Sequence, residues 1–172
     1  MNKNLKLNIG ITLWTLTSKE IRRFMRIWVQ TLVPPAVTMT LYFVIFGSLI
    51  GPRIGEMDGF DYVQFMIPGL IMMSVITGSY ANVVSSFYSV KFQKSIEELL
   101  ISPMPNWVIL LGFILGGVTR GILVGIIVFC VSLFFYPEFQ IVNIGLTITV
   151  LLLTSVLFAL MGFINAVFAD SF

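Results

Sequence analysis

Four long apolar stretches constrain the fold of this chain more than any other feature of its sequence. They occupy residues 27–51, 62–88, 115–136 and 141–168. A helix needs about 20 apolar residues to cross the hydrocarbon of a bilayer. Because a backbone exposed to lipid must satisfy its own hydrogen bonds, such stretches fold as helices. Residues 1–172 are therefore predicted to form a single all-α transmembrane domain, a polytopic membrane helix bundle.

The uneven distribution of charge predicts how the chain is oriented. Only 10% of its residues are charged, against about 25% in soluble domains. Bases gather before the first span and between the second and third: Lys3, Lys6, Lys19, Arg22, Arg23, Arg26, Lys91 and Lys94. The other two loops hold Arg53 and four acidic residues: Glu56, Asp58, Asp61 and Glu138. Since short basic loops stay in the cytoplasm, the N-terminus and residues 91–107 are predicted to be cytoplasmic.

The end of the N-terminal segment 1–26 has the pattern of an interfacial helix. Apolar residues recur there at the spacing of one helix face: Ile21, Phe24, Met25 and Trp28. Basic residues fill the other positions. This pattern predicts a basic amphipathic helix that lies on the inner leaflet, with Thr17 or Ser18 as its cap.

Arg120 is the only arginine inside a predicted span. With the third span placed at 115–136, Arg120 lies about a turn and a half from the inner end of the helix. Its long side chain can then reach the lipid headgroups. A role in substrate binding is the alternative, because charges within a membrane often mark functional sites.

The spans lack the groups that covalent chemistry or proton coupling requires. They contain no Asp, Glu or His away from their ends, whereas a proton-coupled carrier needs a titratable group within the membrane. The sequence also shows no phosphate-binding GxxxxGK[ST] motif, no nucleophile–base pair and no cluster of metal ligands. We therefore expect no catalytic residue, no metal and no bound cofactor, and an ion-coupled carrier is disfavoured.

Packing residues and scattered polar residues are what the spans do offer. Overlapping GxxxG patterns predict close helix packing and involve Gly112, Gly116, Gly117, Gly121 and Gly125. The prolines Pro34, Pro35 and Pro68 are expected to break the first and second spans. Polar residues of the second and fourth spans are candidates for lining a pathway: Ser74, Thr77, Asn82, Ser85 and Asn165. The alternative is that these residues make ordinary hydrogen bonds between helices.

The sequence KFQKSIEELLISPMPNW, at 91–107, predicts a short helix that docks on another protein. Ser95 and Glu98 match a capping box, and Pro103 and Pro105 end the helix within about two turns. A helix this short is marginal alone, and its glutamates disfavour an anionic leaflet, so we expect a protein groove to hold its apolar face. That face comprises Ile96, Leu99 and Leu100. The full set of predicted docking residues is Ser95, Ile96, Glu97, Glu98, Leu99, Leu100 and Pro103.

Three segments resemble the type-2 ABC exporter permeases. The segment SIEELLISPMPNWVILLG is similar to their cytoplasmic loop, while SKEIRRFMRIWVQTLVPPAVTMTLYFVIFGSLIG and FMIPGLIMMSVITGSYANVVSSF are similar to the opening of the family. The resemblance implies a permease subunit that dimerises in the bacterial inner membrane and binds a separate ATP-binding cassette ATPase. It also implies that residues 95–102 form a coupling helix and residues 18–26 an elbow helix, while ATP and Mg²⁺ are used by the partner.

The same resemblance sets an expectation about the number of spans. Such permeases have six spans, whereas the fourth span here is followed directly by ADSF. A C-terminally truncated form or a fragment is therefore expected. Two other functions stay open, namely a non-transporting membrane scaffold that recruits a cytoplasmic partner and the less favoured ion-coupled carrier. Membrane lipid is an expected partner, nucleic acid is not, and the sequence assigns no transported substrate.

Overall fold

The computed structural model describes residues 8–57, 60–137 and 143–169. The chain begins with α1 (Ile9–Arg26) and α2 (Trp28–Val44), which continues as the π-helix η1 (Ile45–Ile50) and the short α3 (Gly51–Ile54). A small hairpin of β1 (Glu56–Met57) and β2 (Phe60–Asp61) follows. The remaining helices are α4 (Tyr62–Phe92), α5 (Ser95–Ile101), α6 (Asn106–Phe135) and α7 (Ile144–Phe168).

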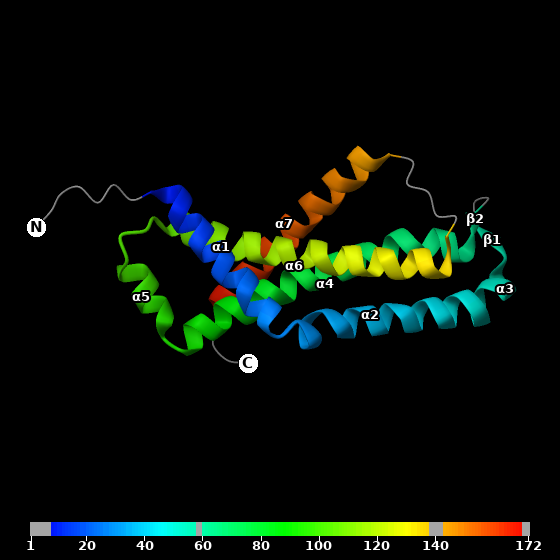
Figure 1. Cartoon of the computed structure of the whole chain (residues 1–172), viewed down its shortest axis with the longest axis horizontal. Coiled ribbons are helices and arrows are strands. Elements are labelled where there is room, and N and C mark those ends of the chain that lie inside the picture. Colours follow the sequence, from blue (N-terminus) through cyan, green and yellow to red (C-terminus); the bar gives the residue numbers. More distant parts are fainter. Residues whose placement is uncertain (1–7, 58–59, 138–142, 170–172) are drawn as a thin grey trace, which may run out of the picture.

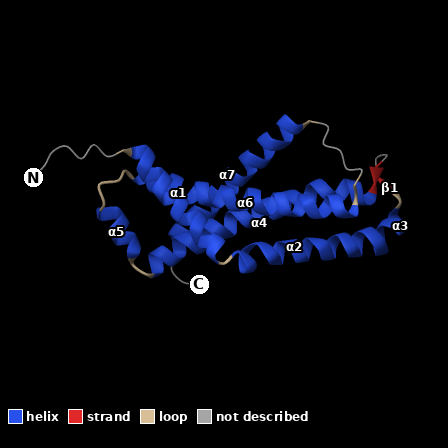
Figure 2. Cartoon of the chain, viewed as in Figure 1, coloured by secondary structure: helices blue, strands red, loops and turns tan. Residues whose placement is uncertain are grey.

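Within the described residues, four helices are long and apolar enough to cross a membrane, which confirms the predicted all-α membrane bundle. They are Trp28–Gly47, Tyr62–Phe92, Asn106–Phe135 and Ile144–Phe168, and helices dominate the fold in Figure 2. The third helix begins at Asn106 rather than at the predicted residue 115. Pro105 has extended backbone angles just before it, and no proline interrupts the sequence from there to Phe135.

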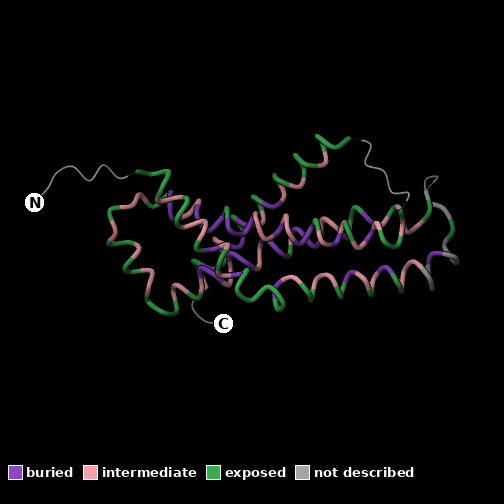
Figure 3. Tube along the Cα trace, viewed as in Figure 1, coloured by how far each residue is buried: buried purple, intermediate pink, exposed green. Residues whose placement is uncertain are grey.

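Helices α4 and α6 form the centre of the bundle, and the other long helices pack against them (Figure 1). Helix α2 runs along one side, while the N-terminal half of α7 diverges from the bundle. Buried positions concentrate along α4 and α6 (Figure 3). One apolar cluster contains Phe87, Phe113 and Ala159, and another contains Phe43 and Val128.

The two ends of the bundle carry different segments. Helices α1 and α5 lie towards one end, and the β1–β2 hairpin lies at the other (Figure 1). The basic segments that precede α2 and separate α4 from α6 therefore share one end of the molecule, as the predicted orientation requires. The acidic hairpin segment is at the opposite end.

Glycines on α6 allow two other helices to approach its backbone closely. A Cβ atom at Gly121 would lie 3.0 Å from the carbonyl oxygen of Val75 in α4. A Cβ atom at Gly112 would lie 2.8 Å from the Cβ of Leu16 in α1. Larger side chains at these positions would push the helices apart, so the close packing predicted from the GxxxG patterns is confirmed for both contacts.

The prolines lie inside continuous helices, so the predicted breaks in the first and second spans are wrong. Helix α2 passes through Pro34 and Pro35, and α4 passes through Pro68. A proline removes one backbone donor, but a membrane helix tolerates this when a neighbouring group satisfies the freed carbonyl. For Pro35 that carbonyl belongs to Thr31, which a side chain from α6 reaches.

Candidate functional site

The helix predicted to dock on a partner is present as α5, but its start differs from the prediction. Lys94 precedes the helix in the left-handed conformation, with φ of 57°, and provides no side-chain cap. Ser95 is already the first helical residue, so the predicted Ser95–Glu98 capping box is wrong. The reason is that the turn at Lys94, whose N–H donates to the Lys91 carbonyl at 3.1 Å, reverses the chain without a cap.

The end of α5 agrees with the prediction. The helix ends at Ile101, and Ser102 has an extended backbone with ψ of 146°. A residue that precedes a proline avoids the helical region because of the clash with the proline ring. Pro103 therefore stops α5 at the predicted place and separates it from α6.

The apolar residues of α5 divide between two directions. Ile96 and Leu99 are partly buried and pack against the apolar cluster that contains Phe87 and Phe113. Leu100 is 59% exposed and Ile101 is 85% exposed. The bundle itself therefore partly covers two of the three residues of the predicted docking face. Two leucine-sized side chains of α5 and its two glutamates are exposed, and we call Glu97, Glu98, Leu100 and Ile101 the coupling surface, after the role predicted for this segment.

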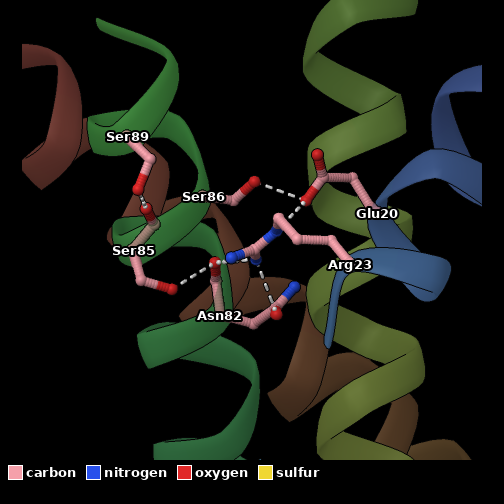
Figure 4. A network of polar contacts seen from close by, with 6 residues as sticks. All are labelled: Glu20, Arg23, Asn82, Ser85, Ser86 and Ser89. Carbon is pink, nitrogen blue, oxygen red and sulfur yellow. Dashed lines mark hydrogen bonds and ion pairs between the residues drawn. The ribbon is translucent and has the colours of Figure 1, made fainter. Parts of the chain in front are cut away.

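A buried carboxylate fixes α1 to the bundle (Figure 4). Glu20 is 3% exposed, and its Oε2 atom accepts hydrogen bonds from Arg23 Nε at 3.2 Å and from the Ser86 hydroxyl of α4. Gly116 of the adjacent α6 has no side chain and so leaves space for Glu20. An ion pair of this kind neutralises both charges where water is scarce.

Arg23 extends the same network to α4. Its Nη2 atom donates to the Asn82 carbonyl at 3.2 Å and to Asn82 Oδ1 at 3.0 Å. Asn82 is fully buried, and its Nδ2 atom has no hydrogen-bond partner. Ser85 Oγ also donates to the Asn82 carbonyl, at 3.1 Å. We call Glu20, Arg23, Asn82 and Ser86 the buried polar network.

Helix α1 begins earlier than predicted, and this change lengthens its contact with α6. The helix starts at Ile9, with Asn8 before it and no side-chain cap. Thr17 and Ser18 therefore lie inside the helix, and neither caps it as predicted. The added turns bring Leu16 against α6 at Gly112, one turn before Glu20 meets Gly116.

Arg120 lies farther from the start of its helix than predicted, because α6 begins at Asn106. It is about 21 Å from that start at 1.5 Å per residue. Its Nη2 atom donates to the Thr31 carbonyl of α2 at 3.5 Å. Its Nε atom is buried without a partner. The side chain thus contacts α2 and is not simply extended along its own helix.

The structure does not bring the five pathway candidates together. The hydroxyls of Ser74, Thr77 and Ser85 donate to carbonyls of their own helix, α4. Asn82 belongs to the buried polar network. Asn165 Nδ2 lies 2.6 Å from the Tyr80 hydroxyl.

Two clefts border α7. The smaller, of about 500 Å³, is lined by Thr77, Tyr80 and Asn165 among others. The larger, of about 840 Å³, lies between α4, α6 and the N-terminal half of α7, and its lining is mostly apolar. Thr77 and Asn165 are therefore the two pathway candidates that share a cleft.

Comparison with known families agrees with this architecture. A model of the family described as "ABC-2 type transporter" matches residues 12–172. The chain belongs to the ABC-2 type transporter family. The match includes α2, α4, α6, α7 and the coupling surface.

Curated relatives of this ABC-2 family chain are transport permeases by name. The "Inner membrane transport permease YadH" of Escherichia coli strain K12 is 60% identical over 162 residues, which are 94% of this chain and 63% of the relative. The proteins of the same name from Escherichia coli O157:H7 and Shigella flexneri match to the same extent. The chain thus spans about 63% of the length of these relatives. No solved structure matches the chain.

Sequence reasoning missed Glu20 in this ABC-2 family chain. The four basic residues near Glu20 mark the polar face of α1, to which a charged residue would ordinarily belong. Glu20, however, lies four residues after Leu16 and four before Phe24, so it shares the apolar face with them. A lone acidic residue between two apolar ones at this spacing was the available signal for a buried partner on another helix.

Proposed function

We propose that this chain is the permease subunit of an ATP-driven exporter, working as a homodimer with a separate ATP-binding cassette ATPase. The observation that carries the proposal is α5, which lies beyond the spans with its glutamates and Leu100 and Ile101 exposed. The family match and the printed name of the relatives support a role in transport. ATP and Mg²⁺ would be used by the partner subunit, in the inner membrane of a bacterium.

The coupling surface combines a small apolar area with negative charge, as a site that binds a partner protein does. Apolar side chains that seat in a groove of a partner contribute most to such contacts, while the charges around them set specificity. Leu100 and Ile101 supply the apolar part, and Glu97 and Glu98 supply negative charge. The partner groove is therefore proposed to be apolar at its base and basic at its rim.

The attachment of α5 suits the transfer of movement to the spans. Ile96 and Leu99 pack against the cluster that contains Phe87 of α4 and Phe113 of α6. A displacement of α5 by the ATPase would therefore press on this cluster, which joins α4 and α6. Opening of a pathway beside Thr77 and Asn165, or between the two copies, is the proposed result.

Co-purification tests the proposal. A tagged chain should recover an ATPase subunit that carries a Walker A sequence, and the recovered complex should hydrolyse ATP. The double variant Glu97→Lys with Leu100→Asp should lower that recovery at least tenfold, which corresponds to about 1.4 kcal/mol. Arg53→Asp, an exposed change at the opposite end of the bundle, is the matched control.

Recovery of the same amount of ATPase by the double variant would remove α5 from the coupling role. A chain that recruits a cytoplasmic protein without Walker sequences would instead favour the membrane scaffold.

A further inference from the structure

Arg120 carries a charge that no acidic side chain balances. Among the side chains that the structure describes, the pair of Glu20 and Arg23 is the only ion pair. Arg120 makes one long hydrogen bond, from Nη2 to the Thr31 carbonyl at 3.5 Å. A guanidinium has five N–H donors, so most of its capacity is unused. A charged group in that state is costly to keep within the hydrocarbon of a membrane.

We propose that Arg120 binds the phosphate group of an anionic phospholipid of the inner leaflet, at the junction of α1, α2 and α6. A guanidinium and a phosphate form strong, directional hydrogen bonds. The contact with Thr31 and the burial of Nε hold the guanidinium in place. Among the described residues Nη1 makes no hydrogen bond, and it is not one of the buried unpartnered atoms, so this nitrogen can donate to a ligand.

The depth of Arg120 allows its side chain to reach a lipid phosphate. Exposed Trp28 lies about one turn before Thr31 on α2, and tryptophans concentrate at the membrane interface. Along α6, Arg120 is about 22 Å from Phe135 at 1.5 Å per residue. Along α4, Asn82 of the neighbouring network is about 30 Å from Tyr62, close to the full hydrocarbon thickness. Helix α4 therefore places the neighbouring network near the inner edge of the hydrocarbon, and the long Arg120 side chain can reach that edge from about 8 Å farther in.

The surrounding charge favours an anionic lipid over a neutral one. Lys19, Arg22 and Arg26 of α1 are exposed beside the junction. The Arg23 charge is already balanced by Glu20, and α2 has no charged residue. Each basic residue near a membrane surface contributes attraction of about 1 kcal/mol towards anionic lipids. These exposed bases would draw the lipid in, while Arg120 would hold its phosphate.

Lipid titration of the purified chain tests the proposal. Native mass spectrometry in detergent would count bound phosphatidylglycerol and, in a parallel sample, bound phosphatidylcholine. We expect tighter binding of phosphatidylglycerol and a loss of about tenfold in its affinity for Arg120→Gln, as removal of a charge-assisted hydrogen bond predicts. Arg120→Lys should lose less affinity, because lysine keeps the positive charge. It should still lose some, because lysine lacks the paired N–H donors of the guanidinium.

Arg22→Gln is the matched control, because it removes an exposed base of α1 and leaves Arg120 unchanged. It should change the affinity less than Arg120→Gln does. Equal losses for the two variants would indicate general surface attraction and would overturn the proposal, as would unchanged binding by Arg120→Gln. In a third experiment, inorganic phosphate is added at the same concentration as the lipid. If it displaces phosphatidylglycerol, the site binds a free anion rather than a lipid, and the proposal is overturned.

A folding check keeps the test decisive. Tryptophan fluorescence of Trp14, Trp28 and Trp107 would show whether Arg120→Gln retains the native fold. If Arg120→Gln does not fold, the lipid affinities of the unaltered chain and of Arg120→Lys are compared instead. Equal affinity of the unaltered chain for phosphatidylglycerol and phosphatidylcholine would then overturn the proposal.

Discussion

Arg120 of α6 donates to the backbone carbonyl of Thr31 in α2, a residue 89 positions earlier in the chain. That carbonyl is the one that Pro35 leaves without its helical donor, because a proline has no N–H to offer four residues back. The arginine thus stands in for a missing backbone group. The contact also joins α2 to α6 beside the end of α1, where the Thr31 hydroxyl donates to the Phe24 carbonyl at 3.2 Å.

Replacing Pro35 should make Arg120 less important for stability. Pro35→Ala restores the N–H that bonds to the Thr31 carbonyl, so Arg120→Gln should cost about 1 kcal/mol less in that background than in the unaltered chain. The free energy of unfolding of the four proteins in this double-mutant cycle, measured by denaturation in detergent, gives the difference. Additive effects of the two changes would show that Arg120 does not substitute for the missing backbone donor.

Removal of the Glu20 carboxylate should loosen α1. Glu20→Gln leaves Arg23 without its counter-charge beside α4, and breaking a buried pair costs about 3–5 kcal/mol. Because the Arg23 side chain is 32% exposed, we expect a smaller loss of unfolding free energy, of about 1–3 kcal/mol. Glu97→Gln, at an exposed position of α5, is the control. It should change the free energy of unfolding by less than about 0.5 kcal/mol.

The double variant Glu20→Gln with Arg23→Gln sharpens this prediction. It removes both charges and should recover part of the stability that Glu20→Gln loses. A double variant as unstable as the sum of the two single variants would mean that the ion pair does not stabilise the contact between α1 and α4.

The sequence predicted the spans well because their signal is local. A long apolar stretch must form a helix in lipid whatever its neighbours are, and the end of α5 followed from Pro103 alone. The failures came from a local turn that the sequence pattern does not reveal and from contacts with a second helix. The turn at Lys94 replaced the capping box, and Arg120 made the break expected at Pro35 unnecessary.

The candidate site was predicted only in part for the same reason. Periodicity placed Ile96, Leu99 and Leu100 on one face, but it could not show that the bundle occupies Ile96 and Leu99. The burial of Glu20 was also hidden, because it depends on the space at Gly116, 96 positions later in the numbering. Contacts between distant helices decide which residues of an amphipathic face are left for a partner.

A methyl group at Gly116 should displace α1. The added Cβ would lie 2.6 Å from Glu20 Cβ, and overpacking of this kind costs about 1–3 kcal/mol. Gly69→Ala is the matched control, because a Cβ there meets nothing within 4 Å. Thermal unfolding followed by circular dichroism should show a lower Tm for Gly116→Ala and an unchanged or higher Tm for Gly69→Ala. Equal Tm values would mean that α1 can move without loss of stability.

Cysteine labelling should place α5 and α3 on opposite sides of the membrane. In a background where Cys130, which is exposed, is changed to Ser, the variants Ile101→Cys and Arg53→Cys both present accessible thiols. A membrane-impermeant maleimide added to intact cells should label residue 53, whereas residue 101 should be labelled only after the membrane is opened. This follows from the basic residues that flank α5 and the acidic residues that flank α3. Labelling of residue 101 from outside would reverse the topology and would place α5 where a cytoplasmic ATPase cannot reach it.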